Sequence, residues 1–270
     1  MKFQMSELIR QVAGFPTGYT PITEIGTRHP EMRMDFGILR LQSGESRDLG
    51  AARECALLML DGEARLEWDG GSGEISRDSL FDQLPWCLHV PSGCDCVVSA
   101  GSRGAELAVQ ATDNTNSFPP RLYAPGDCRV ERRGEGTMNE TSTRFVRTIF
   151  DDRNAPQAEL VLGEVIDFPG RWSSYPPHHH PQPEIYHYRF LPEQGFGLTA
   201  VGEQAFLLRH CDTVLIHPGE DHPQVSAPGY AMYYIWLIRH LEGERYGTPE
   251  FTREHRWVTE PNAKIWPSEA

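Results

Sequence analysis

Short apolar segments separated by turn-forming residues constrain the fold of this chain more than any other feature. Segments of this length and composition, bounded by Gly, Pro and Asp, are typical of β-strands. Four clear examples span residues 36–41, 55–68, 105–111 and 231–238. The sequence therefore predicts an all-β protein. A hairpin turn is expected at Asp61-Gly62, because this dipeptide readily adopts the positive φ angles of a tight turn.

The length and a faint internal repeat predict two domains. A chain of 270 residues exceeds the usual size of one domain. Residues 88–96 and 215–222 each place a Gly-x-x sequence after a strand and a proline turn, ending at Cys96 or His222. We expect an N-terminal β domain without a metal site over residues 1–140, including a connecting arm from about 114 to 139, and a metal-binding β domain over residues 141–270.

Residues 5–13 are the one segment with convincing helical periodicity. Met5, Leu8, Ile9 and Val12 recur at the spacing that places side chains on one face of a helix. The sequence therefore predicts a short helix near the N-terminus.

Net charge and hydropathy exclude several classes of partner. The formal charge of -13, with no Lys/Arg-rich helix and no zinc-finger spacing, argues against nucleic acid. No apolar run approaches the roughly 20 residues that span a bilayer, and the N-terminus lacks the apolar core of a signal peptide. We therefore expect a cytoplasmic protein that does not bind membranes, whose cysteines are thiols.

Histidines gather in one part of the chain and indicate a metal site. Of eleven histidines, seven lie between His178 and His222. His178 and His180 are two residues apart, so they project to the same face of an extended strand. Glu184 supplies a third ligand and His222, after a turn at Pro218-Gly219, a fourth. Three imidazoles and a carboxylate suit zinc, iron, manganese or nickel.

The strand-like run after Pro183 predicts which side chains accompany this site. Alternation places Tyr186 and Tyr188 on the same face as Glu184, and His187 on the opposite face. His187, like His210 and His217, is therefore expected to be structural. We expect Cys96, which stands where the second half has His222, to mark the loss of a metal site from the first half, since no base is apparent beside it.

These motifs resemble those of the cupins. The spacing His-x-His, three residues, then Glu resembles the first cupin motif, and Pro-Gly-x-x-His about forty residues later resembles the second. Residues 160–257 further resemble the 5-deoxy-glucuronate isomerase family of myo-inositol catabolism, through LVLGEVIDFPGRWSSYPPHHH, EIYHYRF and DTVLIHPGEDHPQVSAPGYAMYYIW. The first half matches more weakly, and Cys211 stands where a glycine commonly precedes the aspartate. The resemblance implies a bicupin, two antiparallel β-barrel or jelly-roll domains.

The resemblance also implies a reaction. A metal-dependent aldose-ketose isomerase would convert 5-deoxy-glucuronate to 5-dehydro-2-deoxy-gluconate, using one divalent transition metal ion, with zinc as first choice and manganese, iron or nickel as alternatives. Glu184, Tyr186 and Tyr188 are the candidates for proton transfer. Arg171 and Arg239 are the candidate anchors for the carboxylate of a sugar-acid substrate.

Two other functions fit the same residues. A cupin with this ligand set also suits a metal-dependent oxygenase, which oxygen consumption would distinguish from a redox-neutral isomerase. A non-catalytic sugar-binding cupin is the second alternative, and the absence of a helix-turn-helix or other output module in the sequence argues against a sensory role. Exposed strand edges in such barrels make a homo-oligomer a further expectation.

Overall fold

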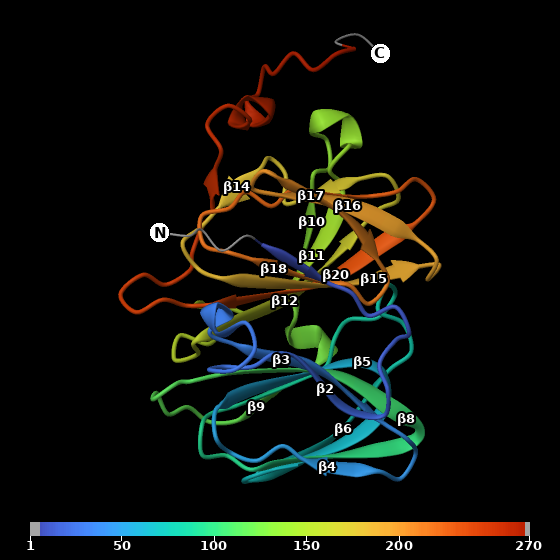
Figure 1. Ribbon diagram of the computed structural model, residues 1–270, viewed down its shortest axis with the longest axis vertical. Coiled ribbons are helices and arrows are strands. Elements are labelled where there is room, and N and C mark those ends of the chain that lie inside the picture. Colours follow the sequence, from blue (N-terminus) through green and yellow to red (C-terminus); the bar gives the residue numbers. More distant parts are fainter. Residues whose placement is uncertain (1–5, 268–270) are drawn as a thin grey trace. The chain divides into compact units, whose positions relative to one another are not determined.

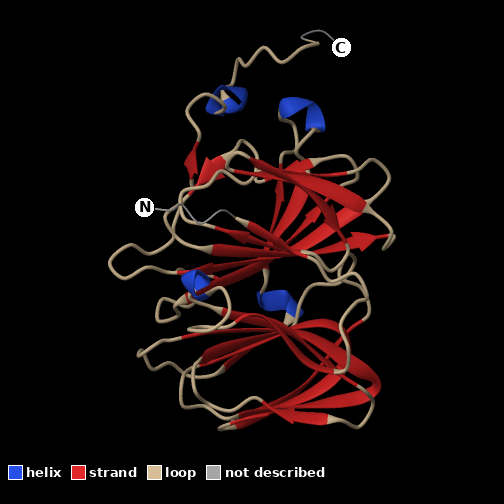
Figure 2. Ribbon diagram, in the orientation of Figure 1, coloured by secondary structure: helices blue, strands red, loops and turns tan. Residues whose placement is uncertain are grey.

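The computed structural model describes residues 6–267 and consists almost entirely of β-strands and loops (Figure 2). Within these residues the helical elements are single 3-10 turns, namely η1 (Pro30–Met32), η2 (Pro125–Asp127), η3 (Met138–Glu140) and η4 (Arg256–Thr259). The predicted all-β class is confirmed. Across residues 6–267 there is no helix whose length and apolar character would let it cross a membrane.

The chain forms two compact units. The N-terminal unit contains residues 13–129 and 148–162, and the C-terminal unit contains residues 130–147, 163–267 and, from the start of the described chain, 6–12. The division is thus not a single cut, because residues 6–12 and 130–140 group with the C-terminal unit and residues 148–162 group with the N-terminal unit. The expected connecting arm, residues 114–139, carries β9 (Arg121–Tyr123), η2, β10 (Arg129–Arg133) and part of η3.

The N-terminal unit is built on one antiparallel sheet (Figure 1). Its strand order is β2-β3-β8-β5-β7-β9, with β4 paired to β8 and β6 paired to β5. The long central strands β5 and β8 pair along most of their lengths. The strands other than β9 are β2 (Gly18–Thr23), β3 (Asp35–Leu41), β4 (Ser46–Asp48), β5 (Glu54–Trp68), β6 (Gly71–Arg77), β7 (Cys87–Val90) and β8 (Cys96–Thr112).

The hairpin expected at Asp61-Gly62 is wrong. Strand β5 continues through this dipeptide, and its register against β8 shifts on both sides, which marks an irregularity in the ladder. Gly62 has a φ of 87°, and a Cβ there would lie 2.2 Å from the Gly104 carbonyl oxygen. The glycine therefore permits a close approach of two strands. The chain reverses instead at a second Asp-Gly dipeptide, Asp69-Gly70, between β5 and β6.

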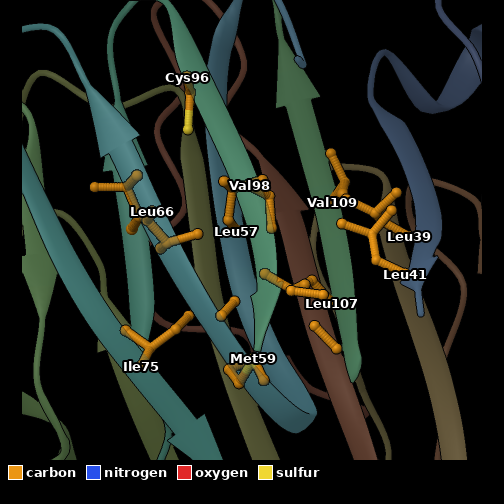
Figure 3. Packing of buried hydrophobic residues seen from close by; sticks show 14 of the residues in the cluster. Leu39, Leu41, Leu57, Met59, Leu66, Ile75, Cys96, Val98, Leu107 and Val109 are labelled. Carbon is orange, nitrogen blue, oxygen red and sulfur yellow. The ribbon is translucent and has the colours of Figure 1, made fainter. Parts of the chain in front are cut away.

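The interior of the N-terminal unit is apolar. Figure 3 shows leucine, valine and isoleucine side chains from β3, β5, β6 and β8 meeting in one cluster, with Cys96 at one end of it. Leu57, Leu66, Val98 and Leu107 are completely buried there. Around Leu66 and Val98 the buried side chains alternate along the strand with more exposed residues, so the period-two pattern directs one face of the sheet inward there.

The C-terminal unit contains a seven-stranded sheet and a four-stranded sheet (Figure 1). The first has the order β1-β18-β15-β20-β12-β11-β10 and the second β13-β19-β16-β17, while β14 and β21 pair separately. Their bounds, besides β10, are β1 (Glu7–Ile9), β11 (Arg144–Phe150), β12 (Leu160–Asp167), β13 (Trp172–Ser173), β14 (His178–His179), β15 (Glu184–Leu191), β16 (Phe196–Val201), β17 (Gln204–Arg209), β18 (Thr213–Ile216), β19 (Gln224–Ser226), β20 (Ala231–Arg239) and β21 (Glu250–Phe251).

The helix predicted over residues 5–13 is also wrong where the structure describes it. Glu7–Ile9 is an edge strand that pairs antiparallel with β18, so that Leu8 lies opposite Val214 and packs against the core. Val12 is 88% exposed and therefore does not share a buried face with Leu8. Met5 lies outside the described residues. Pairing with a partner some 200 residues away outweighs a weak local periodicity.

Strand β15 lies between β18 and β20 and places the candidate site. Every residue from Glu184 to Phe190 is buried, so both faces of the strand are covered. Tyr186, Tyr188 and Phe190 belong to one core cluster, together with Tyr234 of the neighbouring strand β20. His187 bonds through Nδ1 to the Thr213 hydroxyl at 2.8 Å. The strand thus presents aromatic side chains to the inside of the unit.

Candidate metal centre

The side chains of the three consecutive histidines contact different residues. His178 and His179 form β14, which pairs with β21, and His180 follows. The rings of His178 and His180 both approach the His222 ring, with centroid distances of 4.8 and 5.5 Å. His179 instead contacts the Asp221 carboxylate through Nδ1 at 2.9 Å. The structure therefore brings His178 and His180 to one side and His179 to another.

Glu184 stands at the centre of the group. One of its carboxylate oxygens lies 3.1 Å from His180 Nε2 and 3.2 Å from His222 Nε2. Potential ligand atoms of His180, Glu184 and His222 all lie within 4.8 Å of one another, and all three residues are buried. His178 is not part of this tight trio, although its ring lies edge-on to His222.

Hydrogen bonds to main-chain carbonyl groups determine which ring nitrogen carries the hydrogen in two of the imidazoles. His222 Nδ1 lies 2.8 Å from the Glu220 carbonyl oxygen, and His178 Nδ1 lies 3.2 Å from that of Pro176. A carbonyl only accepts, so each Nδ1 carries the hydrogen and each Nε2 presents a lone pair when the ring is neutral. Burial lowers the pKa of His222, and burial together with the His222 charge lowers that of His178 well below its usual value.

The facing atoms therefore have the character of a cation site. His222 Nε2 is buried and forms no hydrogen bond within residues 6–267, yet it lies 3.2 Å from the Glu184 carboxylate. Two electron-rich atoms at this separation repel each other unless a proton or a metal ion lies between them. Buried imidazole and carboxylate donors, with the second ring nitrogen held by a carbonyl, fit a divalent transition metal ion.

The two tyrosines proposed for proton transfer lie at different depths. The Tyr186 ring is 5.7 Å from the His222 ring, and its hydroxyl is 3.2 Å from the Ser174 hydroxyl. Burial, and then the Glu184 charge, raise the pKa of Tyr186 well above its usual value. Tyr188 lies beyond Tyr186 along β15 and donates its hydroxyl hydrogen to Gln224 at 2.5 Å. Tyr186 is therefore the nearer of the two to the histidines.

A loop between β20 and β21 covers one side of the group. The Tyr246 ring lies 5.0 Å from the His180 ring, and the Gln182 side chain donates to the Glu244 carbonyl at 2.7 Å. A cavity of about 290 Å³ lies beside this loop, and Arg245 and His180 are among its lining residues. No motif in the sequence indicates that this loop contacts the histidine segment, because the contacts are long-range.

The arginines proposed as carboxylate anchors have other described contacts. Arg239 donates to the main-chain carbonyl of His240, and the charge of Arg171 acts on Glu140. These contacts do not bring either guanidinium to the group formed by His180, Glu184 and His222. Arg144, at the start of β11, is buried, and its charge acts on His178 and on Asp167.

Arg144 and its surroundings went unnoticed in the sequence because they come from separate strands. Arg144 donates to the Ser142 carbonyl at 2.7 Å. Burial raises the pKa of Asp167 well above its usual value, although the Arg144 charge opposes this. Tyr234 is 2% exposed and bonds through its hydroxyl to Ser173 at 2.6 Å. Only the fold brings these polar groups into one interior.

Two solved structures have a fold similar to that of this chain. An IolB-like protein from Salmonella typhimurium LT2 superposes with a TM-score of 0.83 at 24% sequence identity, over 94% of this chain and 99% of that protein. Lactobacillus farciminis oxalate decarboxylase superposes with a TM-score of 0.66 at 12% identity, over 92% of this chain and 87% of the other. At these identities the comparison concerns the fold, and it agrees with the predicted bicupin.

Proteins of similar sequence carry the same name, 5-deoxy-glucuronate isomerase. The 5-deoxy-glucuronate isomerase of Geobacillus thermodenitrificans is 29% identical over 219 residues, which are 74% of this chain and 77% of the relative. That of Halalkalibacterium halodurans is 27% identical over 251 residues, 86% and 92% of the two chains. The model of the KduI/IolB family matches residues 8–258, nearly the whole sequence. The chain is therefore a member of the KduI/IolB family.

Proposed function

We propose that this protein is a metal-dependent aldose-ketose isomerase that converts 5-deoxy-glucuronate to 5-dehydro-2-deoxy-gluconate in myo-inositol catabolism. The supporting observation is the buried convergence of His180 and His222 on one oxygen of Glu184, with the His222 lone pair directed at a carboxylate. Relatives named 5-deoxy-glucuronate isomerase cover most of the chain and support the choice of substrate.

The proposed ligands are His178, His180, Glu184 and His222. His180 and His222 already face Glu184, and the ring of His178 lies beside His222. We infer zinc as the first choice, with manganese, iron or nickel as alternatives that the same donors accept. A bound divalent ion supplies Lewis-acid stabilisation of the negative charge that develops on the substrate oxygens.

Proton transfer is assigned to Glu184 and Tyr186. Aldose-ketose isomerisation removes a proton from one carbon and delivers it to the next, through an enediolate. A tyrosine whose pKa is raised keeps its proton at neutral pH, so Tyr186 acts as a hydrogen-bond donor or acid and not as the base. The Glu184 carboxylate is the proposed base. Tyr188 lies farther from the histidines than Tyr186 and positions the Gln224 side chain through its hydrogen bond.

The substrate carboxylate requires a cationic partner. Arg144 is the buried guanidinium whose charge reaches His178, so we propose it as the anchor. A guanidinium binds a carboxylate through two parallel hydrogen bonds. Arg171 and Arg239, the candidates from sequence, are to be tested beside it.

We further propose a cytoplasmic, self-associating enzyme. Trp172, Leu198 and Leu207 are each more than a third exposed, and Val225 pairs with both Trp172 and Leu198. Leu198 pairs in turn with Leu207, so these residues form an apolar row across the four-stranded sheet. Such a row suits contact with a second copy of the chain. Light scattering of the purified protein, compared with a Leu198→Glu variant, tests this association.

A single experiment tests the reaction and the metal together. The full chain, reconstituted with zinc, is incubated with 5-deoxy-glucuronate while the sugar is followed by NMR, with and without EDTA. We expect conversion to the ketose, its loss on chelation and its return when metal is restored. His222→Ala should lower bound metal at least tenfold by elemental analysis. His179→Gln is the control, because His179 contacts Asp221 and not Glu184.

The outcomes separate the alternatives. Metal bound through these residues without conversion would reject the isomerase, and an oxygen electrode would then test for oxygenation. Binding of the sugar without turnover would indicate a non-catalytic cupin. Retention of metal by His222→Ala would contradict the proposed ligand set.

A further inference from the structure

The N-terminal unit also contains a cavity, and it lies where the C-terminal unit has its histidines. We propose that this cavity is a second binding site, for a small carboxylate that also carries hydroxyl groups, with Arg47 as the cation that receives the carboxylate. The inference concerns the N-terminal unit alone and does not depend on the isomerase reaction.

Strand register establishes the first equivalence between the units. In the C-terminal unit Glu184 pairs with Ile216, the last residue of β18. In the N-terminal unit Cys55 pairs with Val90, the last residue of β7. Strands β15 and β5 each lie between these short strands and one long antiparallel neighbour, β20 or β8. Cys55 thus occupies the position of Glu184.

A second equivalence follows from the hairpins. Gln224 pairs with Thr199, the third-last residue of β16, and Val98 pairs with Leu66, the third-last residue of β5. Each of these two strands is followed by a two-residue turn. His222 lies two residues before Gln224, and Cys96 lies two residues before Val98. Cys96 therefore occupies the position of His222, as the repeat in the sequence indicated.

The third equivalence concerns the segment before Cys55. Counting back from Cys55 as from Glu184, Leu49 and Ala51 stand at the positions of His178 and His180. Leucine and alanine leave no imidazoles to fill the mouth of the unit. A cavity of about 210 Å³ is present there, and residues 49, 50, 52 and 55 are part of its lining.

Polar side chains from other strands complete the cavity. Its remaining lining residues are Tyr19, Asp35, Arg47, Asp48, Arg53, Val109 and Ala111. Arg53 is already paired, at 3.1 Å with Asp35 and at 2.8 Å with Asp113. Arg47 is exposed, and its charge acts on the Tyr19 hydroxyl. Burial and the Asp35 charge raise the pKa of Tyr19, so its hydroxyl stays protonated.

These groups define the class of ligand. The Arg47 guanidinium suits a carboxylate, and the Tyr19 hydroxyl and the acidic side chains suit hydroxyl groups as hydrogen-bond partners. The volume is smaller than the roughly 300–1,000 Å³ of sites for drug-sized ligands, so a metabolite of about six carbons is the appropriate size. A sugar acid has this chemistry.

Calorimetric titration with D-gluconate tests the site. The full chain is used after removal of metal with EDTA, so that binding at a metal in the C-terminal unit does not contribute. We expect one binding event, weakened at least tenfold by Arg47→Gln. Arg65→Gln is the matched control, because Arg65 lies on β5 but pairs with Glu74 outside the cavity. Ala111→Leu, which fills the cavity from β8, should remove the event.

Two results would overturn the proposal. Absence of binding in the metal-free protein would do so, as would equal affinities in the wild type, Arg47→Gln and Ala111→Leu. Circular dichroism shows whether each variant is folded, and Arg47→Gln, at an exposed position, preserves the test if Ala111→Leu fails to fold. Because no metal or turnover is involved, this result stands apart from success or failure of the isomerase assay.

Discussion

The two units share a strand register but differ in what their central strands place inside. Along β15 the inward side chains are Glu184, Tyr186 and Tyr188, whereas the equivalent positions of β5 carry Cys55, Leu57 and Met59. The same backbone arrangement therefore supports polar side chains at these positions in one unit and apolar side chains in the other. Fold and chemistry are separable in this molecule.

The cost of a polar interior is visible in its hydrogen bonds. Tyr188 bonds to Gln224, and Tyr234 bonds to Ser173, because a buried hydroxyl without a partner is destabilising. The equivalent positions of β5, Cys55, Leu57 and Met59, carry no hydroxyl group that needs such a partner. Burial raises the pKa of the Cys96 thiol to about 12, so this residue stays protonated and packs as a small apolar group.

The largest expected effect is the loss of the carboxylate at the centre of the C-terminal unit. Glu184→Gln keeps the shape but removes the negative charge that faces His180 and His222. We expect isomerase activity to fall at least about a thousandfold, since both metal affinity and the proposed base are affected. Activity is measured by NMR and bound metal by elemental analysis.

The equivalent position in the other unit supplies the control. Cys55→Ser changes the residue that corresponds to Glu184, and we expect metal content and turnover to remain within about twofold of the wild type. If Cys55→Ser removed the metal, or Glu184→Gln retained it, the contrast between the units would be rejected.

The second effect concerns stability. Leu57→Ala leaves a cavity in the apolar cluster of the N-terminal unit, where Leu57 is completely buried, and should lower the free energy of unfolding of that unit by about 2–5 kcal/mol. Urea denaturation followed by circular dichroism measures the change. Val130→Ala, at a position 44% exposed in the C-terminal unit, is the comparison and should change the free energy of unfolding of the N-terminal unit by less than about 0.5 kcal/mol. Equal effects of the two substitutions would argue against an apolar core at Leu57.

Sequence reasoning succeeded where the information is local. The alternation of apolar and polar residues predicted strands, and the spacing of His180 and Glu184 predicted two neighbours, whose side chains lie 3.1 Å apart. His222 was found through a turn motif and lies beside Glu184 in the structure. Short-range geometry of an extended chain is sufficient for such inferences.

Sequence reasoning failed where distant segments decide. Leu8 and Ile9 belong to a run with helical spacing but pair with β18, and Asp61-Gly62 is a turn-forming dipeptide but lies inside β5 against Gly104. Arg144 carries no motif, and its place near His178 follows only from the packing of β11. In each case a partner far along the chain outweighs the local preference.

A smaller effect distinguishes the three arginines. Arg144→Gln should lower kcat/KM by about ten- to a hundredfold, mainly through KM, because it removes a charge-assisted hydrogen bond to the substrate carboxylate. Arg171→Gln and Arg239→Gln should each change kcat/KM by less than about threefold. Steady-state kinetics of the three variants decides among them, and a larger loss in either of the latter two would transfer the anchor role to that residue.

The smallest expected effect tests whether the tyrosine interior is an interacting network. Tyr188→Phe removes the hydroxyl that donates to Gln224 and should lower the free energy of unfolding by about 1 kcal/mol. Gln224→Met removes the acceptor. Each single substitution leaves the other buried partner of this hydrogen bond unpaired, whereas the double substitution removes both partners. The double substitution should therefore cost less free energy of unfolding than the sum of the two single ones. Urea denaturation of the four proteins completes the cycle. Strict additivity would mean that Tyr188 and Gln224 contribute independently, and that the two interiors differ in side-chain chemistry without a coupled network in either.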